Sequence, residues 1–480
     1  MWFRVMMGSW VLVFICSCSI AFSETNSGVS PTAAASSAPT DRTRAKPAPT
    51  NRSGRWRGNA ELRPLENIQG IILIDATVSA AGRDTAGVFA LDTGAGFVAL
   101  DSQLARIIGI SSTVSASTAI GTAEKPIDRL QIGHLQFDQV QPVLTIDAGV
   151  VRQVTERPVL GLIGSHLFAH HVLIIDYRAN ELGLIAPTAA DSQPDRAAHG
   201  TEEPAGGSRG HARNKRVPEA EAFRVSRESL MDAVNPKAAP IAFKLAGDDK
   251  MLVTAQVSNH SNDLSDTLTL VLDTGATKTA LFAHALAAKG TSFDAWPALR
   301  GLTAPTLVGS EEARLARVRR LVVGRGTHVA RASNVDVAVL DSPLERALSA
   351  EIGEPVDGLL GYSFLRRFRV VIDYPHRVMW LEPVPHPYDE RPYEYSNVGL
   401  QIERRNGALR AVGVATGSPA DVAGIARDDE ILAIDGTSSS DLDVISASKL
   451  LEGRPGTAVR ITLRRGTNER TYRLIRRRLL

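Results

Sequence analysis

Cysteine is almost absent from this chain of 480 residues. The two cysteines present, Cys16 and Cys18, both lie within the first twenty residues. No disulfide is therefore expected in the folded part of the protein, whose stability must come from packed cores. A cysteine nucleophile in a folded catalytic site is excluded for the same reason.

The chain is also poor in aromatic residues and has no excess of charge of one sign. Phe, Trp and Tyr make up 5% of the sequence, and 54 Lys and Arg face 52 Asp and Glu, for a net charge of +2. Nucleic-acid binding needs a strongly cationic surface or a stacking platform, so no nucleic-acid partner is expected. With 44% hydrophobic residues, the sequence instead indicates a soluble protein of two to four domains.

The main apolar run stands at the start of the chain. Arg4 is followed by an apolar stretch from Val5 to Ile15, which is too short to span a bilayer comfortably. This layout is typical of a secretory signal, and we expect residues 1–23 to direct export to the periplasm or cell envelope.

Two processing outcomes fit this signal. Ala21-Phe22-Ser23 offers the small residues that signal peptidase reads, which gives a soluble product beginning at Glu24. Ile15-Cys16-Ser17-Cys18 resembles a lipobox, in which Cys18 would be lipidated and would anchor the protein to the membrane. Both outcomes remain open on the sequence.

Two polar stretches divide the rest of the chain. Residues 24–60 are rich in Ser, Thr, Pro and Ala, and residues 188–238 hold few apolar side chains, so both are expected to be flexible linkers. A shorter proline-rich break lies between Pro383 and Pro392. We therefore expect folded blocks at 61–187, 239–386 and 395–480.

The first two blocks repeat one another in the order of their motifs. The matching segments are Asp92-Thr-Gly-Ala and Asp273-Thr-Gly-Ala, Arg129-Leu-Gln-Ile-Gly133 and Arg320-Leu-Val-Val-Gly324, Gly161-Leu-Ile-Gly164 and Gly358-Leu-Leu-Gly361, and Ile175-Asp-Tyr177 and Ile372-Asp-Tyr374. Because the order is kept while the spacings differ, the two blocks are expected to be copies of one fold.

The repeated blocks have mainly strand signals. Short β-rich runs, such as Ile71–Val78, Val140–Ile146 and Val172–Asp176, are bounded by Gly, Asp or Pro. One short helix is expected after each Gly-x-x-Gly motif, at Ser165–His170 and at Ser363–Phe368. The sequence thus predicts two small, mainly β domains with one helix each.

The repeated Asp-Thr-Gly turn carries the chemistry. An apolar strand delivers the carboxylate, the Thr hydroxyl can bond across the turn backbone, and the Gly allows a second loop to approach closely. If the two turns face each other, Asp92 and Asp273 lie a few Å apart and share one proton. One carboxylate then takes a proton from water while the other protonates a peptide carbonyl oxygen, which hydrolyses the bond without a covalent intermediate.

On these motifs both blocks resemble retropepsin-type aspartic protease domains. The resemblance implies two tandem β-barrel domains that form a pseudodimer within one chain, with Asp92 and Asp273 as the catalytic pair and no metal or organic cofactor. It also implies that four residues support the catalytic pair: Thr93, Gly94, Thr274 and Gly275. Two hairpin flaps are expected to close over the substrate, one at Ser112–Pro126 with Gly121 near its tip and one at Leu302–Arg314 with Gly309.

Other arrangements of the two blocks are also compatible with the sequence. One or both Asp-Thr-Gly turns could be inherited fold elements without activity, and each block could pair with its counterpart in a second chain across the long linker. His170-His171 is interpreted as a pair without a metal, because no carboxylate or cysteine stands at ligand spacing.

The last block resembles a bacterial PDZ domain, from Asn397-Val-Gly-Leu400 through Asp429-Glu-Ile-Leu-Ala-Ile-Asp-Gly436 to the final apolar strand. The family pattern usually has Gly where Asp428 stands. The resemblance implies a small α+β fold that adds an extended peptide to a sheet edge, with Val398, Gly399 and Leu400 forming a nest for the peptide's C-terminal carboxylate.

Together these features predict an exported aspartic endopeptidase, monomeric with an internal pseudodimer. It would cleave proteins of the cell envelope, and its PDZ domain would bind substrate or partner peptides. The competing hypothesis is a non-catalytic envelope scaffold in which the PDZ domain binds peptides and the two repeated blocks only support it.

Overall fold

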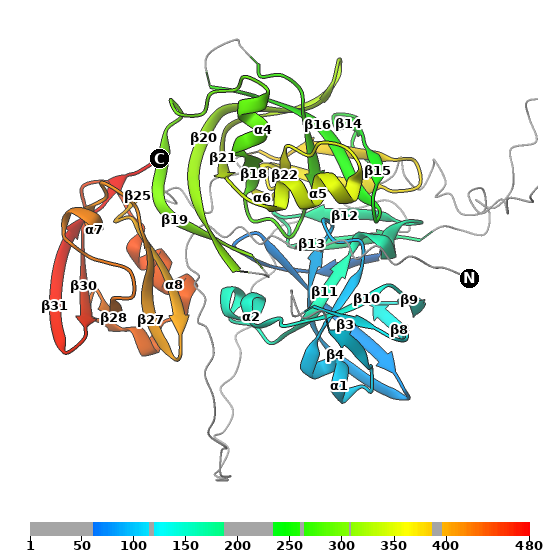
Figure 1. Cartoon of the computed structure of the whole chain (residues 1–480), viewed down its shortest axis with the longest axis horizontal. Helices are drawn as coiled ribbons and strands as arrows, with labels where there is room; N and C mark the ends of the chain where they lie inside the picture. The colour runs from blue at the N-terminus through cyan, green and yellow to red at the C-terminus, as the bar shows by residue number, and fades with distance from the viewer. Residues whose placement is uncertain (1–60, 115–119, 187–233, 260–263, 307–308, 386–395) are drawn as a thin grey trace, which may run out of the picture.

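The computed structural model describes residues 61–114, 120–186, 234–259, 264–306, 309–385 and 396–480 (Figure 1). The predicted signal with Cys18, the linker 24–60 and most of the linker 188–238 lie outside these ranges. The described chain is mainly β, as the sequence predicted. Within these ranges no helix is long and apolar enough to cross a membrane.

The first repeated block folds into a lobe built on one large sheet. Its strands pair in the order β6-β7-β10-β5-β11-β4-β3-β8-β9, and β2 pairs with β3. The bounds are β2 (Glu66–Ile68), β3 (Ile71–Ala80), β4 (Arg83–Asp92), β5 (Val98–Asp101), β6 (Ser112–Val114), β7 (Gly121–Ala123), β8 (Ile127–Ile132), β9 (Leu135–Val140), β10 (Val143–Ile146) and β11 (Val159–Gly164).

The second block forms a lobe whose sheet closes into a barrel. Its strands pair in the order β15-β16-β17-β22-β18-β21-β20-β19, and an additional pairing of β16 with β20 closes the ring. The bounds are β15 (Lys244–Ala246), β16 (Lys250–Ser258), β17 (Leu268–Leu272), β18 (Thr279–Phe282), β19 (Ala298–Thr306), β20 (Gly309–Arg325), β21 (His328–Leu340) and β22 (Gly358–Leu360).

The first glycine of each Gly-x-x-Gly motif lies where two paired strands approach too closely for any side chain. A Cβ on Gly161 would stand 2.1 Å from the carbonyl oxygen of Ala99, and one on Gly358 would stand 2.1 Å from that of Ala280. The strands that hold these motifs run parallel to the strands that lead to the Asp-Thr-Gly turns, β11 beside β4 and β22 beside β17. The repeated glycines are therefore required for strand packing beside the candidate site.

A third sheet joins the two lobes. Its strands pair in the order β1-β13-β12-β23-β24-β14, with β12 of the first lobe against β23 of the second. The bounds are β1 (Glu61–Pro64), β12 (Val172–Asp176), β13 (Glu181–Ile185), β14 (Ala239–Ala242), β23 (Phe368–Asp373) and β24 (Val378–Pro383). The repeated Ile-Asp-Tyr motifs end β12 and β23, and one apolar core runs through both lobes. Within this single chain the two copies form a pseudodimer.

The expectation of one helix in each lobe was wrong. The first lobe has helices α1 (Ser102–Ile107) and α2 (Gly149–Thr155), and the second has α4 (Ala283–Ala288) and α5 (Leu344–Ile352). The helices expected after the Gly-x-x-Gly motifs are a 3-10 turn, η1 (Ser165–Phe168), and α6 (Tyr362–Leu365). Helices of only six to nine residues give too few apolar repeats to stand out from short strands.

The last block is a separate α+β unit beside both lobes (Figure 1). Its main sheet runs β26-β27-β28-β30-β31, with β29 on β28, and β25 pairs with β32 apart from it. The bounds are β25 (Ser396–Asn397), β26 (Leu400–Arg405), β27 (Ala408–Val414), α7 (Pro419–Val422), β28 (Glu430–Ile434), β29 (Thr437–Ser438), η3 (Ser439–Asp441), α8 (Val444–Leu451), β30 (Ala458–Arg465), β31 (Asn468–Ile475) and β32 (Arg477–Arg478).

Truncation of Ile372 in the inter-lobe sheet should destabilise both lobes together, because this fully buried side chain belongs to the core that they share. We expect I372A to lower the free energy of unfolding by about 2 to 5 kcal/mol. The matched control I107A removes a side chain that is 61% exposed and should change the free energy by less than about 0.5 kcal/mol. Urea denaturation measures both, and equal effects of the two substitutions would contradict a shared core.

Candidate active site

The two predicted catalytic carboxyl groups come from equivalent places in the two lobes. Asp92 is the last residue of β4, and Asp273 directly follows β17. Asp92 is 1% exposed and Asp273 is 5% exposed, so both carboxyl groups lie inside the protein. The apolar strands before them are buried and fix where each turn begins.

The two carboxyl groups face one another across the lobe interface, close enough for each to change the pKa of the other. A Cβ on Gly94 would lie 2.7 Å from Cγ of Asp273, and a Cβ on Gly275 would lie 2.6 Å from Oδ2 of Asp92. Each glycine is therefore required by the carboxyl group of the other lobe. The structure thus brings together the pair that the sequence predicted.

Backbone amides of each turn hold its own carboxylate. The Gly94 N–H donates to Oδ1 of Asp92 at 2.9 Å, and the Gly275 and Ala276 N–H groups donate to Oδ1 of Asp273 at 2.8 and 3.0 Å. These bonds fix the direction in which each carboxyl group points. Gly94 and Gly275 thus have two roles, because they supply an amide and leave room for the opposite aspartate.

The two threonines lock the lobes together reciprocally. The Thr93 N–H donates to Oγ1 of Thr274 at 3.0 Å, and the Thr274 N–H donates to Oγ1 of Thr93 at 3.1 Å. Each hydroxyl then donates to a carbonyl oxygen of the other lobe, Thr93 to Leu272 at 3.3 Å and Thr274 to Leu91 at 3.1 Å. The expectation that each hydroxyl bonds across its own turn was therefore wrong, because its partners belong to the opposite copy.

Burial and mutual repulsion separate the pKa values of the two carboxyl groups. Burial raises the pKa of Asp92 to about 6, against the opposing effect of hydrogen bonds from Asp273 and Gly94 and of the positive charge on Lys250. Burial and the nearby charge of Asp92 raise the pKa of Asp273 well above its ordinary value. The two carboxyl groups therefore titrate as a unit that holds one proton, and the charge of Lys250 favours Asp92 as the ionised member.

A buried lysine cluster beside the pair was not foreseen from the sequence. Lys250 is 4% exposed, and its ammonium group donates to Asp248 and to Oε1 of Glu351, the latter at 2.6 Å. Asp248 in turn accepts the Gly96 N–H at 3.1 Å, which ties this cluster of the second lobe to the loop that holds Asp92. A lysine at the start of an apolar strand carries no sequence signal that distinguishes it from a surface residue.

The predicted flaps correspond to hairpins whose tips lie outside the described residues. In the first lobe β6 pairs with β7 so that Val114 faces Gly121, and in the second lobe β19 pairs with β20 so that Thr306 faces Gly309. Residues 115–119 and 307–308, between these strands in the sequence, lie outside the described residues. Both hairpins therefore lie where the sequence placed them, and their role as flaps stays a prediction.

The predicted peptide nest lies in the loop before β26. Val398 and Leu400 are buried in the core of the last block, and Gly399 has a φ of 85°, which favours glycine. The Gly399 N–H donates to Oδ1 of Asn397 at 2.8 Å, so that amide has an internal partner in this state. Asp428, at the position where glycine was expected, adopts a φ of 67°. Carboxylate binding by this loop stays a prediction.

The interpretation of His170-His171 as a pair without a metal stays a prediction. His171 packs against Phe137 with ring centroids 5.3 Å apart, and burial lowers the pKa of His171 to about 4. Among the residues that the structure describes, no three His, Cys, Asp or Glu side chains are grouped as metal ligands.

Two family models match parts of the chain. Residues 253–364 match the aspartyl protease model, and residues 410–465 match the PDZ domain model. The chain therefore carries an aspartyl protease domain of retropepsin-like type and a PDZ domain near its C-terminus. These matches support a peptidase that also has a peptide-binding module.

Known proteins are similar to parts of the chain. The carboxy-terminal processing protease CtpA of Bacillus subtilis (strain 168) is 35% identical over 71 residues, which are 15% of this chain and 15% of that protein. The aspartic proteinase from Irpex lacteus is 13% identical, with 69% of this chain and 99% of that chain covered and a TM-score of 0.37. A retropepsin-like aspartic protease from Rickettsia conorii is 20% identical, with 28% and 95% covered and a TM-score of 0.20.

Removal of the Thr274 hydroxyl should loosen the lobe interface. T274V leaves the Thr93 N–H and the Leu91 carbonyl without their partner in a buried place, at a cost of about 1 to 3 kcal/mol for each group. The matched variant T274S keeps the hydroxyl and loses one methyl group, which is worth about 1 kcal/mol. Denaturant unfolding compares the two, and equal loss in both would show that the hydroxyl bonds do not stabilise the interface.

Proposed function

We propose that this protein is an aspartic endopeptidase that hydrolyses peptide bonds through a water molecule activated between Asp92 and Asp273. The observation that carries the proposal is the pair of buried carboxyl groups facing each other from two copies of one fold. The match of residues 253–364 to aspartyl proteases supports the same reaction class.

The position of Lys250 assigns the roles, because its positive charge favours ionisation of Asp92. Asp92 is the carboxylate that takes a proton from water, and Asp273 is the carboxylic acid that protonates the peptide carbonyl oxygen. The water oxygen bonds to the carbonyl carbon and forms a tetrahedral diol. The C–N bond then breaks as the proton gained by Asp92 passes to the leaving nitrogen, and Asp273 recovers its proton from a diol hydroxyl. Both carboxyl groups end as they began.

The surrounding residues prepare the pair for this reaction. Gly94 and Gly275 point backbone amides at the carboxylates, and Thr93 and Thr274 hold the two turns in register. Preorganised dipoles need no rearrangement as charge develops in the reaction, so they lower the barrier. We assign these four residues as supports that do not themselves exchange protons with the substrate.

The PDZ domain and the leader complete the proposal. A PDZ domain fits peptide binding, and we propose that the loop of Val398, Gly399 and Leu400 receives the C-terminal carboxylate of a substrate or partner. The charged-then-apolar start of the chain supports export to the cell envelope, either as a soluble protein or anchored by lipid on Cys18. Envelope proteins would then be the substrates.

Neutralisation of either aspartate should abolish cleavage. In the chain from Glu24 onward, D92N and D273N each remove one half of the acid-base pair, and we expect kcat on unfolded casein to fall by about 10² to 10⁴-fold. The control D84N changes an exposed aspartate at the start of β4 and should leave the rate unchanged. Equal cleavage by all four chains, or none by the wild type, would contradict the proposal and favour the scaffold hypothesis.

The rate should rise as the pH increases through about 6. Below this pH Asp92 is protonated and neither carboxyl group accepts a proton from water; above it Asp92 is ionised while Asp273 keeps its proton. An assay of kcat/KM with a fluorogenic peptide at a series of pH values measures this rise. Burial also raises the pKa of Asp248 to about 7, so D248N serves as the control and should retain the rise. A rate that falls across this range would contradict the assigned roles.

A further inference from the structure

The last block is attached to the second lobe by the side chain of Gln401. This side chain, 2% exposed, donates from Nε2 to the carbonyl oxygen of Thr303 at 2.9 Å, and its Oε1 accepts the Thr303 N–H at 3.0 Å. The side-chain amide of Gln401 thus bonds the N–H and the carbonyl of Thr303, as a neighbouring strand would. Thr303 lies in β19, which belongs to the hairpin that was predicted to be a flap. The Thr416 N–H adds a bond to the Arg300 carbonyl at 3.0 Å.

The same block is attached to the first lobe through the end of α2. Gln153 donates from Nε2 to the carbonyl oxygen of Arg404 at 3.2 Å, and Glu156 accepts the Val444 N–H at 2.8 Å and the Arg404 Nε–H at 3.4 Å. Ile445 of α8 packs against the apolar core of the first lobe. Both β26 and the start of α8 are therefore held by Gln153 of α2 and by Glu156, which directly follows the helix.

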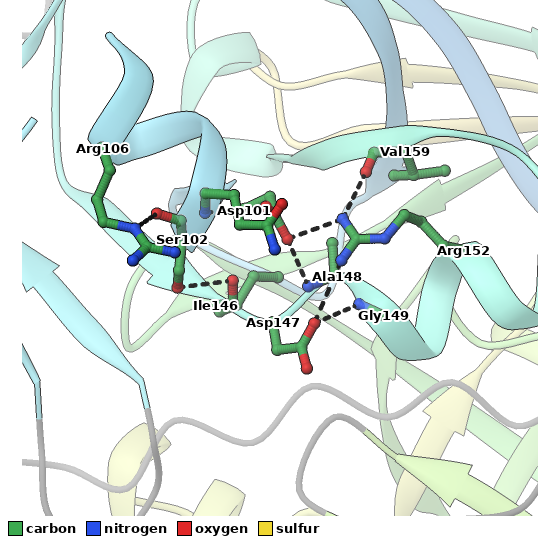
Figure 2. Close-up of polar contacts among 10 residues, drawn as sticks. Asp101, Ser102, Arg106, Ile146, Asp147, Ala148, Gly149, Arg152 and Val159 are labelled. Carbon is green, nitrogen blue, oxygen red and sulfur yellow. Dashed lines mark hydrogen bonds and ion pairs between the residues drawn. The ribbon is translucent and has the colours of Figure 1, made fainter. Parts of the chain in front are cut away.

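Helix α2 is itself firmly fixed within the first lobe (Figure 2). The Arg152 guanidinium donates to Oδ2 of buried Asp101 at 2.8 Å and to the Val159 carbonyl at 3.2 Å. Oδ2 of Asp101 also accepts the Ala148 N–H, just before the helix begins, at 3.2 Å. Although burial opposes it, these bonds lower the pKa of Asp101 below its ordinary value. The contacts of α2 with the last block are thus made from an anchored support.

These contacts lie where a bound peptide would pass. β26 is an edge strand of its sheet, and α8 lies beside it. A peptide that adds to this edge with its carboxylate at residues 398–400 runs along β26 toward Arg404. There the Arg404 carbonyl is already bonded to Gln153, and the Arg404 guanidinium is paired with Glu156.

We propose that the end of α2 is an internal ligand that closes the upstream end of the PDZ peptide edge. A peptide that fills the whole edge must displace Gln153 and Glu156, so peptide binding and docking on the first lobe exclude each other. The proposal rests on the proposed peptide-binding role of the PDZ domain. It also identifies the chemistry of the fitting peptide, which has a free C-terminal carboxylate and an acidic residue about four positions upstream that replaces Glu156 on Arg404.

This competition couples the PDZ domain to the second lobe. A peptide that releases the PDZ block from α2 leaves the block attached to the second lobe through Gln401 and Thr416. The block is then held against the β19–β20 hairpin without its contacts to the first lobe. Because the two events are thermodynamically linked, docking on α2 weakens peptide binding by the same factor by which a bound peptide weakens docking. Peptide occupancy would therefore be transmitted to the β19–β20 hairpin.

The test measures peptide binding to the full chain from Glu24 onward. The probe is a fluorescein-labelled hexapeptide, Ser-Glu-Glu-Ser-Val-Leu, with a free carboxylate, followed by fluorescence anisotropy. In the double variant Q153A/E156A we expect the Kd to fall by about 5- to 50-fold, because the internal competitor is lost. The control D84A changes an exposed residue remote from α2 in sequence and should bind like the wild type. The single variant Q153A removes the bond to the Arg404 carbonyl alone and should have an intermediate Kd.

The outcomes separate this inference from the function on which it rests. Equal Kd values for wild type and both α2 variants would overturn the closure and leave PDZ binding in place. Equal binding of the same peptide with an amidated C-terminus would contradict carboxylate recognition by the loop at 398–400. No binding to any chain at about 1 mM probe would overturn both the peptide-binding role and the closure. Unfolding midpoints of all variants confirm that each chain is folded.

Discussion

The structure depends on the close approach of the two Asp-Thr-Gly turns. Four hydrogen bonds of Thr93 and Thr274 cross between the lobes, and each glycine leaves space for the opposite carboxyl group. This approach explains why both copies keep all three residues. A larger residue at either glycine would collide with the opposite aspartate, and an apolar residue at either threonine would leave buried backbone groups unpaired.

Two buried carboxyl groups in contact carry an electrostatic cost that the surroundings partly offset. Turn amides stabilise the ionised form of each, and the charge of Lys250 favours ionisation of Asp92 in particular. Lys250 belongs to the second lobe and is balanced by Asp248 and Glu351, so the cluster adds charge beside the pair without leaving an unpaired buried ion. The two copies are therefore similar in backbone and different in the electrostatics around their two carboxyl groups.

The PDZ domain is integrated with the protease lobes. It contacts the second lobe through Gln401 and the first lobe through Gln153 and Glu156. The PDZ domain is therefore attached to both halves of the pseudodimer by side-chain contacts. Gln153, Glu156 and Gln401 each bond a backbone group across these contacts.

The sequence by itself determined the repeat, the candidate carboxyl pair and the PDZ block, because these depend on local motifs: an apolar strand before Asp-Thr-Gly, a second copy in the same order, and a glycine-bearing loop before a strand. Only the tertiary structure decided the partners of Thr93 and Thr274, the place of Lys250, and the docking of α2 on the PDZ domain. Those contacts join residues more than a hundred positions apart, as Gly96 and Asp248 or Gln153 and Arg404 show. A single sequence records which side chains are present, but their distances are set only when the lobes pack.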